Sequence, residues 1–469
     1  MTTSVHLIGI GGSGLSGIAR VLLESGYTVS GSDRLSSPLA ESLRADGVRV
    51  CIGHQASNIT GVDLVVRSSA IPDDNPEVLA ALAAGIPVLK RSEFLGQLMQ
   101  GKQSIAIAGS HGKTTTSAMI AWMLVEAGLD PSFIVGGVLK NLGVNARAGA
   151  GQPFVIEADE YDHMFLGLNP DIAVITNIEY DHPDCYPTPA EYRQAFLDFA
   201  SRLAPDGWLL ACSDDPGAAN LSVTLSTKHG FQGKIETYGL NDKDRSQASY
   251  RASQLAPNAA GGFSFKAVYH APDGSAVPLG DVTLQAPGVH NVRNALAALA
   301  VGHHLDIPSE QVAHALGAYQ GSGRRFEVVG EPRGIALVND YAHHPTEIRA
   351  TLAAARVRYP GRRLWAVWQP HTYSRTQALQ AEFSTAFNDA DQVVVTEIYA
   401  AREPAQAFSS ASLAASMLHP SAHFVPSLDE GVRFLLAHLA PGDVVLVLSA
   451  GDADQVIVQL LAALENKKA

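Results

Sequence analysis

The stretch IAIAGSHGKTTT, residues 105–116, gives the clearest indication of how this chain folds. Its apolar first half predicts a buried strand, and the glycines after it predict a tight turn into a helix. Such a turn directs backbone N–H groups and the positive end of a helix dipole at one point, where an anion can bind. The segment therefore favours an α/β fold with a phosphate-binding loop.

The polar residues of this loop suit a nucleoside triphosphate. Lys113 is expected to neutralise the β- and γ-phosphates, and the hydroxyl of Thr114 is expected to bind Mg²⁺. The strict pattern G-x-x-x-x-G-K-[ST] would have glycine in place of Ile107, so an ordinary strand–turn–helix corner is the alternative for this segment taken alone. The predicted ATP contacts in the loop are Gly109, Ser110, His111, Gly112, Lys113, Thr114 and Thr115.

Length and composition indicate a globular protein of about three domains, with 469 residues, 46% apolar and 17% charged. Its three cysteines, Cys51, Cys185 and Cys212, lie far apart and form no C-x-x-C pair, so neither a disulfide framework nor a zinc site is indicated. A formal net charge of -13, without a cluster of Lys and Arg, argues against a nucleic-acid partner. An anionic ligand would have to be held by local groups.

The targeting signals of exported proteins are not found in the sequence. The N-terminus has no basic region and breaks into glycines after a short apolar run, and no later apolar stretch approaches the length of a bilayer span. We therefore expect a cytoplasmic protein without membrane insertion, present as a monomer or a weak homodimer.

The first hundred residues predict a βαβ unit followed by further parallel strands. Strands are expected at 5–10, 27–30, 63–66 and 86–89, with the turn Gly9-x-Gly11-x-x-Gly14 and the acidic Asp33 placed as in dinucleotide-binding folds. The fingerprint serves many nucleotides and nucleotide sugars. A nicotinamide-dependent oxidoreductase is therefore an alternative, although it leaves Lys113 without a task.

Two later strands end in acidic clusters. Residues 154–156 run into EADEYD and residues 172–176 run into NIEYDH, which place Glu157 and His182 at strand ends. If these strands flank the phosphate-loop strand, both side chains face the nucleotide and could bind Mg²⁺ together with Thr114. We expect only Glu157 of the first cluster to reach the metal. The alternative is that Glu160 and its neighbours form a solvated strand end.

The remainder predicts an added antiparallel sheet and a third α/β unit. Residues 233–289 alternate in the manner of β-strands, and a glycine-flanked break at 321–323 precedes strands at 335–338, 364–368, 392–396 and 444–449. VNDYAHHP (338–345) and QPHTYSRT (369–376) follow two of these strands. Their arginine could grip a phosphate or carboxylate, whereas adjacent histidines do not form a zinc-protease pair. Surface ion pairs are the alternative for these clusters.

The motifs together resemble the Mur ligases of peptidoglycan synthesis. GIGGSGLSG, GSHGKTTT, EADEYD, NIEYDH, HNVRNALAA, GRRFE, NDYAHHP and QPHTYSRT occur in the family's order across essentially the whole chain. The resemblance implies three α/β domains: a Rossmann-like UDP-sugar domain at 1–101, a central P-loop ATPase-type domain with an added antiparallel sheet at 102–322, and a Rossmann-like amino-acid domain at 323–469. It is greatest to the branch that uses L-alanine.

Carried over to this chain, the resemblance implies a complete set of site residues. Lys113, Glu157, His182 and Arg325 would be catalytic, and Thr114, Glu157 and His182 would bind Mg²⁺. His290, Asn291, Asn294, Arg325 and Asp340 would complete the ATP site. Gly11, Gly12, Ser13, Gly14, Asp33, Ser68 and Ser69 would bind the UDP-sugar, and Tyr341, His344 and Arg375 would bind the amino acid.

The implied activity is ATP-dependent ligation of L-alanine to the lactyl carboxylate of UDP-N-acetylmuramate through an acyl phosphate. Two positions depart from sister ligases: Phe196 replaces a carbamylated lysine, and Thr372 stands where some members have arginine. A ligase for a recycled murein tripeptide and a non-catalytic UDP-sugar-binding protein are the remaining alternatives.

Overall fold

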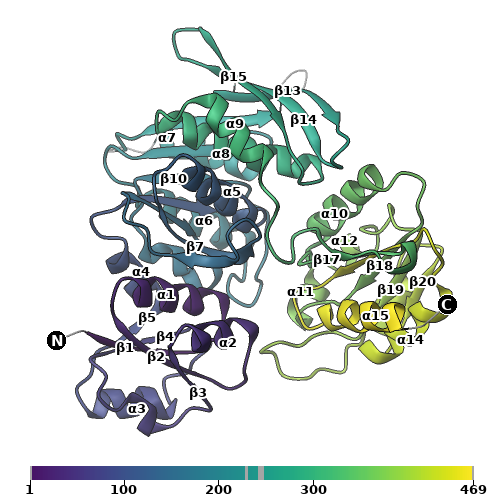
Figure 1. The fold of residues 1–469 in the computed structure, drawn as a ribbon, viewed down its shortest axis with the longest axis horizontal. Coiled ribbons are helices and arrows are strands. Elements are labelled where there is room, and N and C mark those ends of the chain that lie inside the picture. Colours follow the sequence, from purple (N-terminus) through teal and green to yellow (C-terminus); the bar gives the residue numbers. More distant parts are fainter. Residues whose placement is uncertain (1–2, 228–230, 241–247, 467–469) are drawn as a thin grey trace.

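The computed structural model describes residues 3–227, 231–240 and 248–466, which form three bodies, each built on its own β-sheet (Figure 1). We call them the first body (β1–β5), the central body (β6–β15) and the third body (β16–β21). The three-unit α/β architecture expected from the sequence is confirmed. None of the helices in the described ranges combines the length and apolar character needed to cross a membrane.

The first body is a parallel five-stranded sheet in the order β3-β2-β1-β4-β5. Gly9 follows β1 with φ of 92° and opens the turn into α1, as the glycine pattern predicted. The carboxyl ends of the parallel strands form one edge, and helices α1 and α4 pack against the central body. The elements are β1 (Ser4–Ile8), α1 (Ser13–Glu24), β2 (Thr28–Asp33), α2 (Pro38–Ala45), β3 (Arg49–Ile52), η1 (Ala56–Ile59), β4 (Leu64–Arg67), α3 (Pro76–Ala83), β5 (Val88–Lys90) and α4 (Arg91–Leu98).

A buried polar network beneath this edge fixes the end of β2. The Glu77 carboxylate is fully buried and accepts hydrogen bonds from Ser32 Oγ and Asn58 Nδ2, both at 2.5 Å. Burial alone would raise the pKa of Glu77, but His6 and these two donors lower it to about 2. Because Ser32 immediately precedes Asp33, the network positions the predicted UDP-sugar contact.

This network predicts an acid-sensitive first body. The pKa of Glu77 is about 2 in the folded protein and its ordinary value is 4.5. The carboxylate therefore contributes to the free energy of unfolding above pH 4.5, and this contribution is lost as the pH falls toward 2. It amounts to about 3 kcal/mol at neutral pH. Glu77→Gln should therefore lower the thermal unfolding midpoint strongly at pH 7 and much less at pH 3, whereas exposed Glu41→Gln should change it little at either pH. An equal loss at both pH values would contradict the ionic contribution.

The central body has one mixed sheet in the order β15-β14-β13-β12-β11-β10-β6-β9-β7-β8. Strands β9, β6, β10, β11 and β12 are parallel, while β13–β15 form the expected antiparallel extension. Its elements are β6 (Gln103–Ala108), α5 (Lys113–Glu126), β7 (Ser132–Leu139), β8 (Val144–Arg147), β9 (Pro153–Glu157), η2 (Tyr161–Gly167), β10 (Ile172–Ile175), α6 (Pro189–Ala200), β11 (Trp208–Cys212), α7 (Pro216–Thr227), β12 (Lys234–Leu240), β13 (Tyr250–Pro257), β14 (Phe263–His270), β15 (Ala276–Thr283), α8 (Val289–His304) and α9 (Ser309–Gly317).

The third body is a six-stranded sheet in the order β16-β17-β21-β18-β19-β20, with helices on both faces (Figure 1). Successive residues of β17 pack alternately into two separate apolar clusters, as a doubly covered sheet requires. Its elements are β16 (Glu327–Gly330), η3 (Pro332–Gly334), β17 (Ala336–Asp340), α10 (Pro345–Arg358), β18 (Leu364–Trp368), α11 (Tyr373–Ala378), α12 (Gln380–Phe383), β19 (Gln392–Val395), α13 (Ser410–Ser416), β20 (Ala422–Phe424), α14 (Leu428–His438), β21 (Val444–Leu448) and α15 (Asp454–Asn466).

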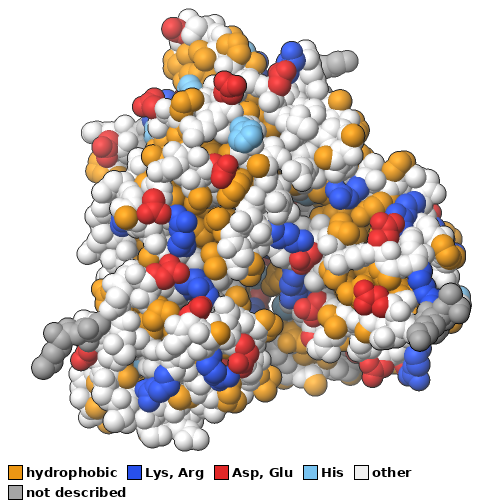
Figure 2. All heavy atoms as spheres, in the orientation of Figure 1, with side chains coloured by type: hydrophobic (Ala, Val, Ile, Leu, Met, Phe, Trp, Pro, Cys, Tyr) orange, Lys and Arg blue, Asp and Glu red, His pale blue; other side chains and the backbone are white. Residues whose placement is uncertain are grey.

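The link between the central and third bodies is short and hydrogen-bonded. Gly321 adopts φ of 95°, Ser322 forms a bridge with Leu139, and Gly323 N donates to Val138 O at 2.9 Å. Figure 2 shows a hollow where the three bodies meet, with acidic and basic side chains around it.

Candidate active site

The phosphate loop lies between the ends of two strands. Strand β6 pairs in parallel with β9 on one side and β10 on the other. Because parallel strands end at the same edge of a sheet, Glu157 at the end of β9 and His182 beyond β10 both lie beside the loop. Gly112 ends the loop with φ of 82°, a left-handed conformation that favours glycine, and α5 begins at Lys113. The predicted neighbourhood of these three segments is confirmed.

Lys113 is folded back onto its own loop and onto Glu160. Its Nζ donates to the carbonyl groups of Gly109 at 2.5 Å and Ser110 at 3.2 Å, and it lies 2.7 Å from Glu160 Oε2. Glu160 is fully buried. Although burial raises the pKa of its carboxyl, Lys113 and His182 lower it to about 2. The alternative of a solvated Glu160 is therefore wrong, because this residue is the counter-ion of the loop lysine.

Thr114 connects the loop to the end of β9 and to the third body. Its Oγ1 donates to Glu157 Oε1 at 3.0 Å and accepts from Arg325 Nη2 at 3.1 Å. The other Glu157 oxygen accepts from Gly136 N at 2.7 Å. Burial raises the pKa of Glu157 more than Lys113 and Arg325 lower it. The hydroxyl and carboxylate oxygens of Thr114 and Glu157 form a pair suited to Mg²⁺.

His182 lies in an ion-pair network with the third body. Arg375 is buried, and its Nε donates to Asp181 Oδ1 at 2.7 Å while its Nη2 lies 3.3 Å from His182 Nδ1. His182 Nε2 lies 3.3 Å from Glu160 Oε1. Burial lowers the pKa of His182, but Asp181 and Glu160 more than offset this effect and raise it. Asp181 was not predicted as a site residue, and its place before His182 was the only signal in the sequence.

A cavity of about 480 Å³ opens beside the loop. Asn294 Nδ2 donates to Asn291 Oδ1 at 3.0 Å, and burial lowers the pKa of His290 to about 4, which leaves that ring neutral. The predicted ATP contacts that line the cavity are His111, Gly112, Thr115, His290, Asn291, Asn294, Arg325 and Asp340. Lining residues that the sequence reasoning missed include Asn177, Glu179, Asp214, Asp215 and Arg293.

The start of the third body presents Arg325 and Asp340 to this cavity. The buried Asp340 carboxylate accepts from the backbone N–H of Phe326 at 2.7 Å and Ala342 at 2.8 Å, which fixes the turn after the link. Burial raises the pKa of Asp340. The Arg325 guanidinium lies 4.8 Å from the centre of the Tyr341 ring. This cation–π contact helps to hold Arg325 in the orientation in which it contacts Thr114.

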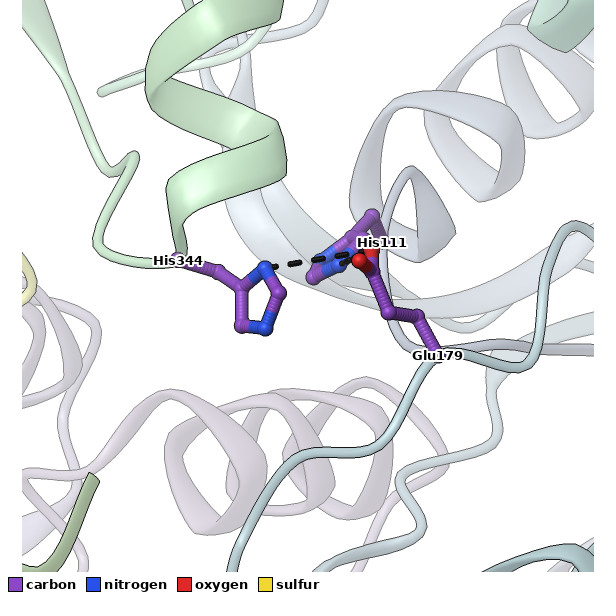
Figure 3. Close-up of side chains that lie close together, drawn as sticks. All are labelled: His111, Glu179 and His344. Atoms are coloured by element: carbon purple, nitrogen blue, oxygen red, sulfur yellow. Dashed lines mark hydrogen bonds and ion pairs between the residues drawn. The ribbon is translucent and has the colours of Figure 1, made fainter. Parts of the chain in front are cut away.

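A second contact between the bodies involves His111, Glu179 and His344 (Figure 3). His111 Nε2 lies 3.0 Å from Glu179 Oε2, its Nδ1 lies 3.2 Å from Glu347 Oε1, and its ring lies 4.7 Å from that of His344. Thr346 Oγ1 also donates to Glu179 at 2.7 Å. Burial lowers the pKa of His111, but the two carboxylates raise it to about 10. A proton on His111 therefore satisfies both carboxylates, and the cluster is an ion-pair contact between the two bodies.

The glycine turn of the first body is held by hydrogen bonds at the end of β1. Gly11 N donates to Asp33 Oδ2 at 2.9 Å, and Ser37 Oγ donates to Gly11 O at 2.9 Å. Gly12 is the N-cap of α1, where no side chain caps the helix. The residues predicted to bind here lie at one sheet edge: Gly11, Gly12, Ser13 and Gly14 follow β1, Asp33 ends β2, and Ser68 and exposed Ser69 follow β4.

Three segments of the chain match the models of three domains from one protein family. Residues 4–103 match "Mur ligase family, catalytic domain", residues 107–302 match "Mur ligase middle domain", and residues 324–451 match "Mur ligase, glutamate ligase domain". The chain belongs to the Mur ligase family. The three matched segments correspond to the three sheets of this Mur ligase.

Relatives of this Mur ligase cover nearly its whole length. It is 44% identical to the UDP-N-acetylmuramate--L-alanine ligase of Roseiflexus sp. (strain RS-1), over 96% of this chain and 97% of that protein. It is also 44% identical to the enzyme of that name from Geotalea uraniireducens, over 98% of each chain. The crystal structure of UDP-N-acetylmuramate-alanine ligase from Thermotoga maritima superposes with a TM-score of 0.83 at 27% identity, over 99% of this chain and 100% of that one.

A murein peptide ligase from Psychrobacter arcticus also shares the fold. It superposes with a TM-score of 0.74 at 25% identity, and the alignment covers 100% of both chains. The three-body architecture is therefore shared with a murein peptide ligase as well as with a UDP-N-acetylmuramate-alanine ligase.

Proposed function

We propose that the protein joins L-alanine to the lactyl carboxylate of UDP-N-acetylmuramate at the expense of ATP, in the cytoplasm. The observation that carries this proposal is full-length similarity, at 42–44% identity, to enzymes named for that reaction. The site geometry supports it, because Lys113, Glu157 and Arg325 from two bodies converge on one phosphate loop. An oxidoreductase would use the glycine turn of the first body but not this loop.

The proposed reaction has two steps. A lactyl carboxylate oxygen attacks the γ-phosphorus of ATP and ADP leaves. The neutral amine nitrogen of L-alanine then attacks the acyl carbon, the bond between that carbon and the phosphate oxygen breaks, and the amine proton leaves with the phosphate. The first step brings two anionic groups together, and the second develops negative charge on the acyl oxygen and the leaving phosphate, so Lys113 and Arg325 would neutralise charge in both. Mg²⁺ would be held by Thr114 and Glu157, with His182 as the candidate for a second ion, and would supply further positive charge at the phosphate oxygens.

The three bodies are proposed to divide the substrates. Residues 1–101 would bind the UDP-sugar, residues 102–322 would bind ATP in the cavity of about 480 Å³, and residues 323–469 would present the amino acid through Tyr341, His344 and Arg375. Contacts such as Arg325 to Thr114 would close the site and keep water from the acyl phosphate.

Release of phosphate from ATP tests this function. Purified protein with Mg²⁺ and UDP-N-acetylmuramate should release phosphate when L-alanine is added, and mass spectrometry should show the UDP-N-acetylmuramoyl-L-alanine product. L-Serine, glycine and the murein tripeptide are the comparison substrates. Faster turnover with the tripeptide than with L-alanine would favour the alternative branch, and no turnover with either would overturn the proposal.

Arg375→Lys should raise the KM for L-alanine much more than the KM for ATP or UDP-N-acetylmuramate. Lysine keeps the charge but loses the planar fork that can hold an α-carboxylate, at a cost of about 1.5–3 kcal/mol. Steady-state kinetics with each substrate varied separately is the measurement. Arg363→Lys, whose arginine pairs with Asp443 instead, is the matched control. A rise confined to the KM for ATP would assign Arg375 to the nucleotide site.

A further inference from the structure

Arg91 lies at the junction of the first and central bodies, outside every motif that the sequence analysis used. It is the first residue of α4 and directly follows β5, so it lies at the same sheet edge as the glycine turn after β1. Its side chain is 18% exposed. Ligands of open α/β sheets bind at such an edge, because the loops after the parallel strands meet there.

The Arg91 guanidinium is incompletely paired although it is mostly buried. Nη2 lies 3.3 Å from Asp159 Oδ2, which is a long ion pair, while Nε is buried without a hydrogen-bond partner among the described residues. A buried unpaired N–H costs free energy, so an arginine in this state is prepared to receive an acceptor.

The guanidinium also covers the first turn of α1. A Cβ added at Gly14 would lie only 2.1 Å from Arg91 Nη1, so the arginine occupies space that any other residue at position 14 would fill. The first turn of α1 contains no acidic residue, and its N-cap makes no side-chain hydrogen bond. The free N–H groups of the helix and the guanidinium therefore converge on the same point.

A small cavity of about 60 Å³ lies between this point and Glu157. Its lining includes Ser13, Gly14 and Arg91 from the first body and Gly136 and Glu157 from the central body. A sugar nucleotide that runs from the glycine turn to Glu157 must pass Arg91. The cavity is smaller than a sugar, so binding has to widen it or turn the arginine away from Asp159.

We propose that Arg91 binds the diphosphate of the UDP-sugar. This inference rests on the proposed function and adds a residue to it. Arg91 would exchange its long ion pair with Asp159 for two parallel hydrogen bonds to phosphate oxygens, opposite the N–H groups of α1. A chain with a net charge of -13 needs such a local cation to hold a doubly charged linker.

Isothermal titration of UDP, UDP-N-acetylmuramate and a non-hydrolysable ATP analogue tests the assignment. Arg91→Met and Arg91→Lys should weaken binding of UDP and of UDP-N-acetylmuramate by a similar factor, roughly 10- to 100-fold for the methionine variant. Affinity for the ATP analogue should stay within about twofold. Arg20→Lys, in α1 of the same body and paired with Asp46, is the matched control and should change none of the three.

Each other pattern overturns the assignment in a recognisable way. Weaker binding of UDP-N-acetylmuramate with unchanged binding of UDP would place Arg91 at the sugar or lactyl carboxylate. Weaker binding of the ATP analogue alone would place Arg91 at the triphosphate. Asp159→Asn, which frees Arg91, should leave UDP affinity unchanged or tighter. A loss of UDP affinity in Asp159→Asn equal to that in Arg91→Met would mean that the ion pair between the two residues only supports the fold. If the unaltered protein binds UDP but not UDP-N-acetylmuramate, the proposed function itself fails.

Discussion

Lys113→Ala is expected to reduce ATP-dependent phosphate release by roughly 10²- to 10³-fold or more. The lysine is the only cationic side chain of residues 105–116 apart from His111. A carboxylate cannot approach a triphosphate unless the negative charge of the triphosphate is neutralised. Single-turnover kinetics at saturating ATP measures the effect on the chemical step. Turnover near that of the unaltered protein would remove the phosphate-loop assignment.

The structure adds a stability effect that the sequence did not reveal. Lys113 is the nearest counter-ion of the fully buried Glu160, so its removal leaves a carboxylate with His182 as its remaining ion-pair partner among the described residues and Tyr192 as a hydrogen-bond donor. Breaking a buried pair from one side costs about 3–5 kcal/mol, and Lys113→Ala should lower the unfolding midpoint accordingly.

The double variant with Glu160→Gln separates the two effects. It removes the stranded charge and should recover most of the lost stability, but none of the lost activity. Thermal unfolding and phosphate release measured on the same samples make this distinction. If activity returned together with stability, Lys113 would be a structural residue and not a phosphate ligand.

The sequence was sufficient to predict the site residues that lie at the ends of neighbouring parallel strands. Glu157 and His182 come directly after apolar runs, and parallel pairing brings such strand ends to one sheet edge regardless of the length of chain between them. The glycine turns were equally readable, because Gly112 adopts a backbone conformation that other residues rarely reach. The three-body architecture and the position of the phosphate loop were therefore predictable.

The sequence was insufficient where burial or contact between bodies determines a residue's role. Glu160 lies in an acidic stretch typical of solvated strand ends, yet the fold buries it completely. The contact between Arg375 and Asp181 joins positions 194 residues apart, and no local pattern encodes it. Arg91 follows a short strand without any glycine motif, so only its position over Gly14 reveals it.

Glu157→Gln is expected to raise the Mg²⁺ concentration needed for half-maximal activity by roughly 10-fold or more. The amide keeps the size of the side chain and can still accept the hydrogen bond from Gly136, so the fold is preserved. It loses the negative charge that a divalent cation requires. Titration of activity with Mg²⁺ at fixed ATP gives the half-saturation value.

Glu160→Gln is the matched comparison, because it neutralises a buried carboxylate three residues away. Its oxygens face Lys113 and His182, so the substitution should lower turnover by loosening the lysine while leaving the Mg²⁺ half-saturation value within about twofold. The two variants are thus expected to separate the metal ligand from the residue that positions the lysine. Equal shifts in Mg²⁺ requirement would show that both carboxylates bind the ion, and a shift in Glu160→Gln alone would mean that the wrong carboxylate has been assigned to the metal.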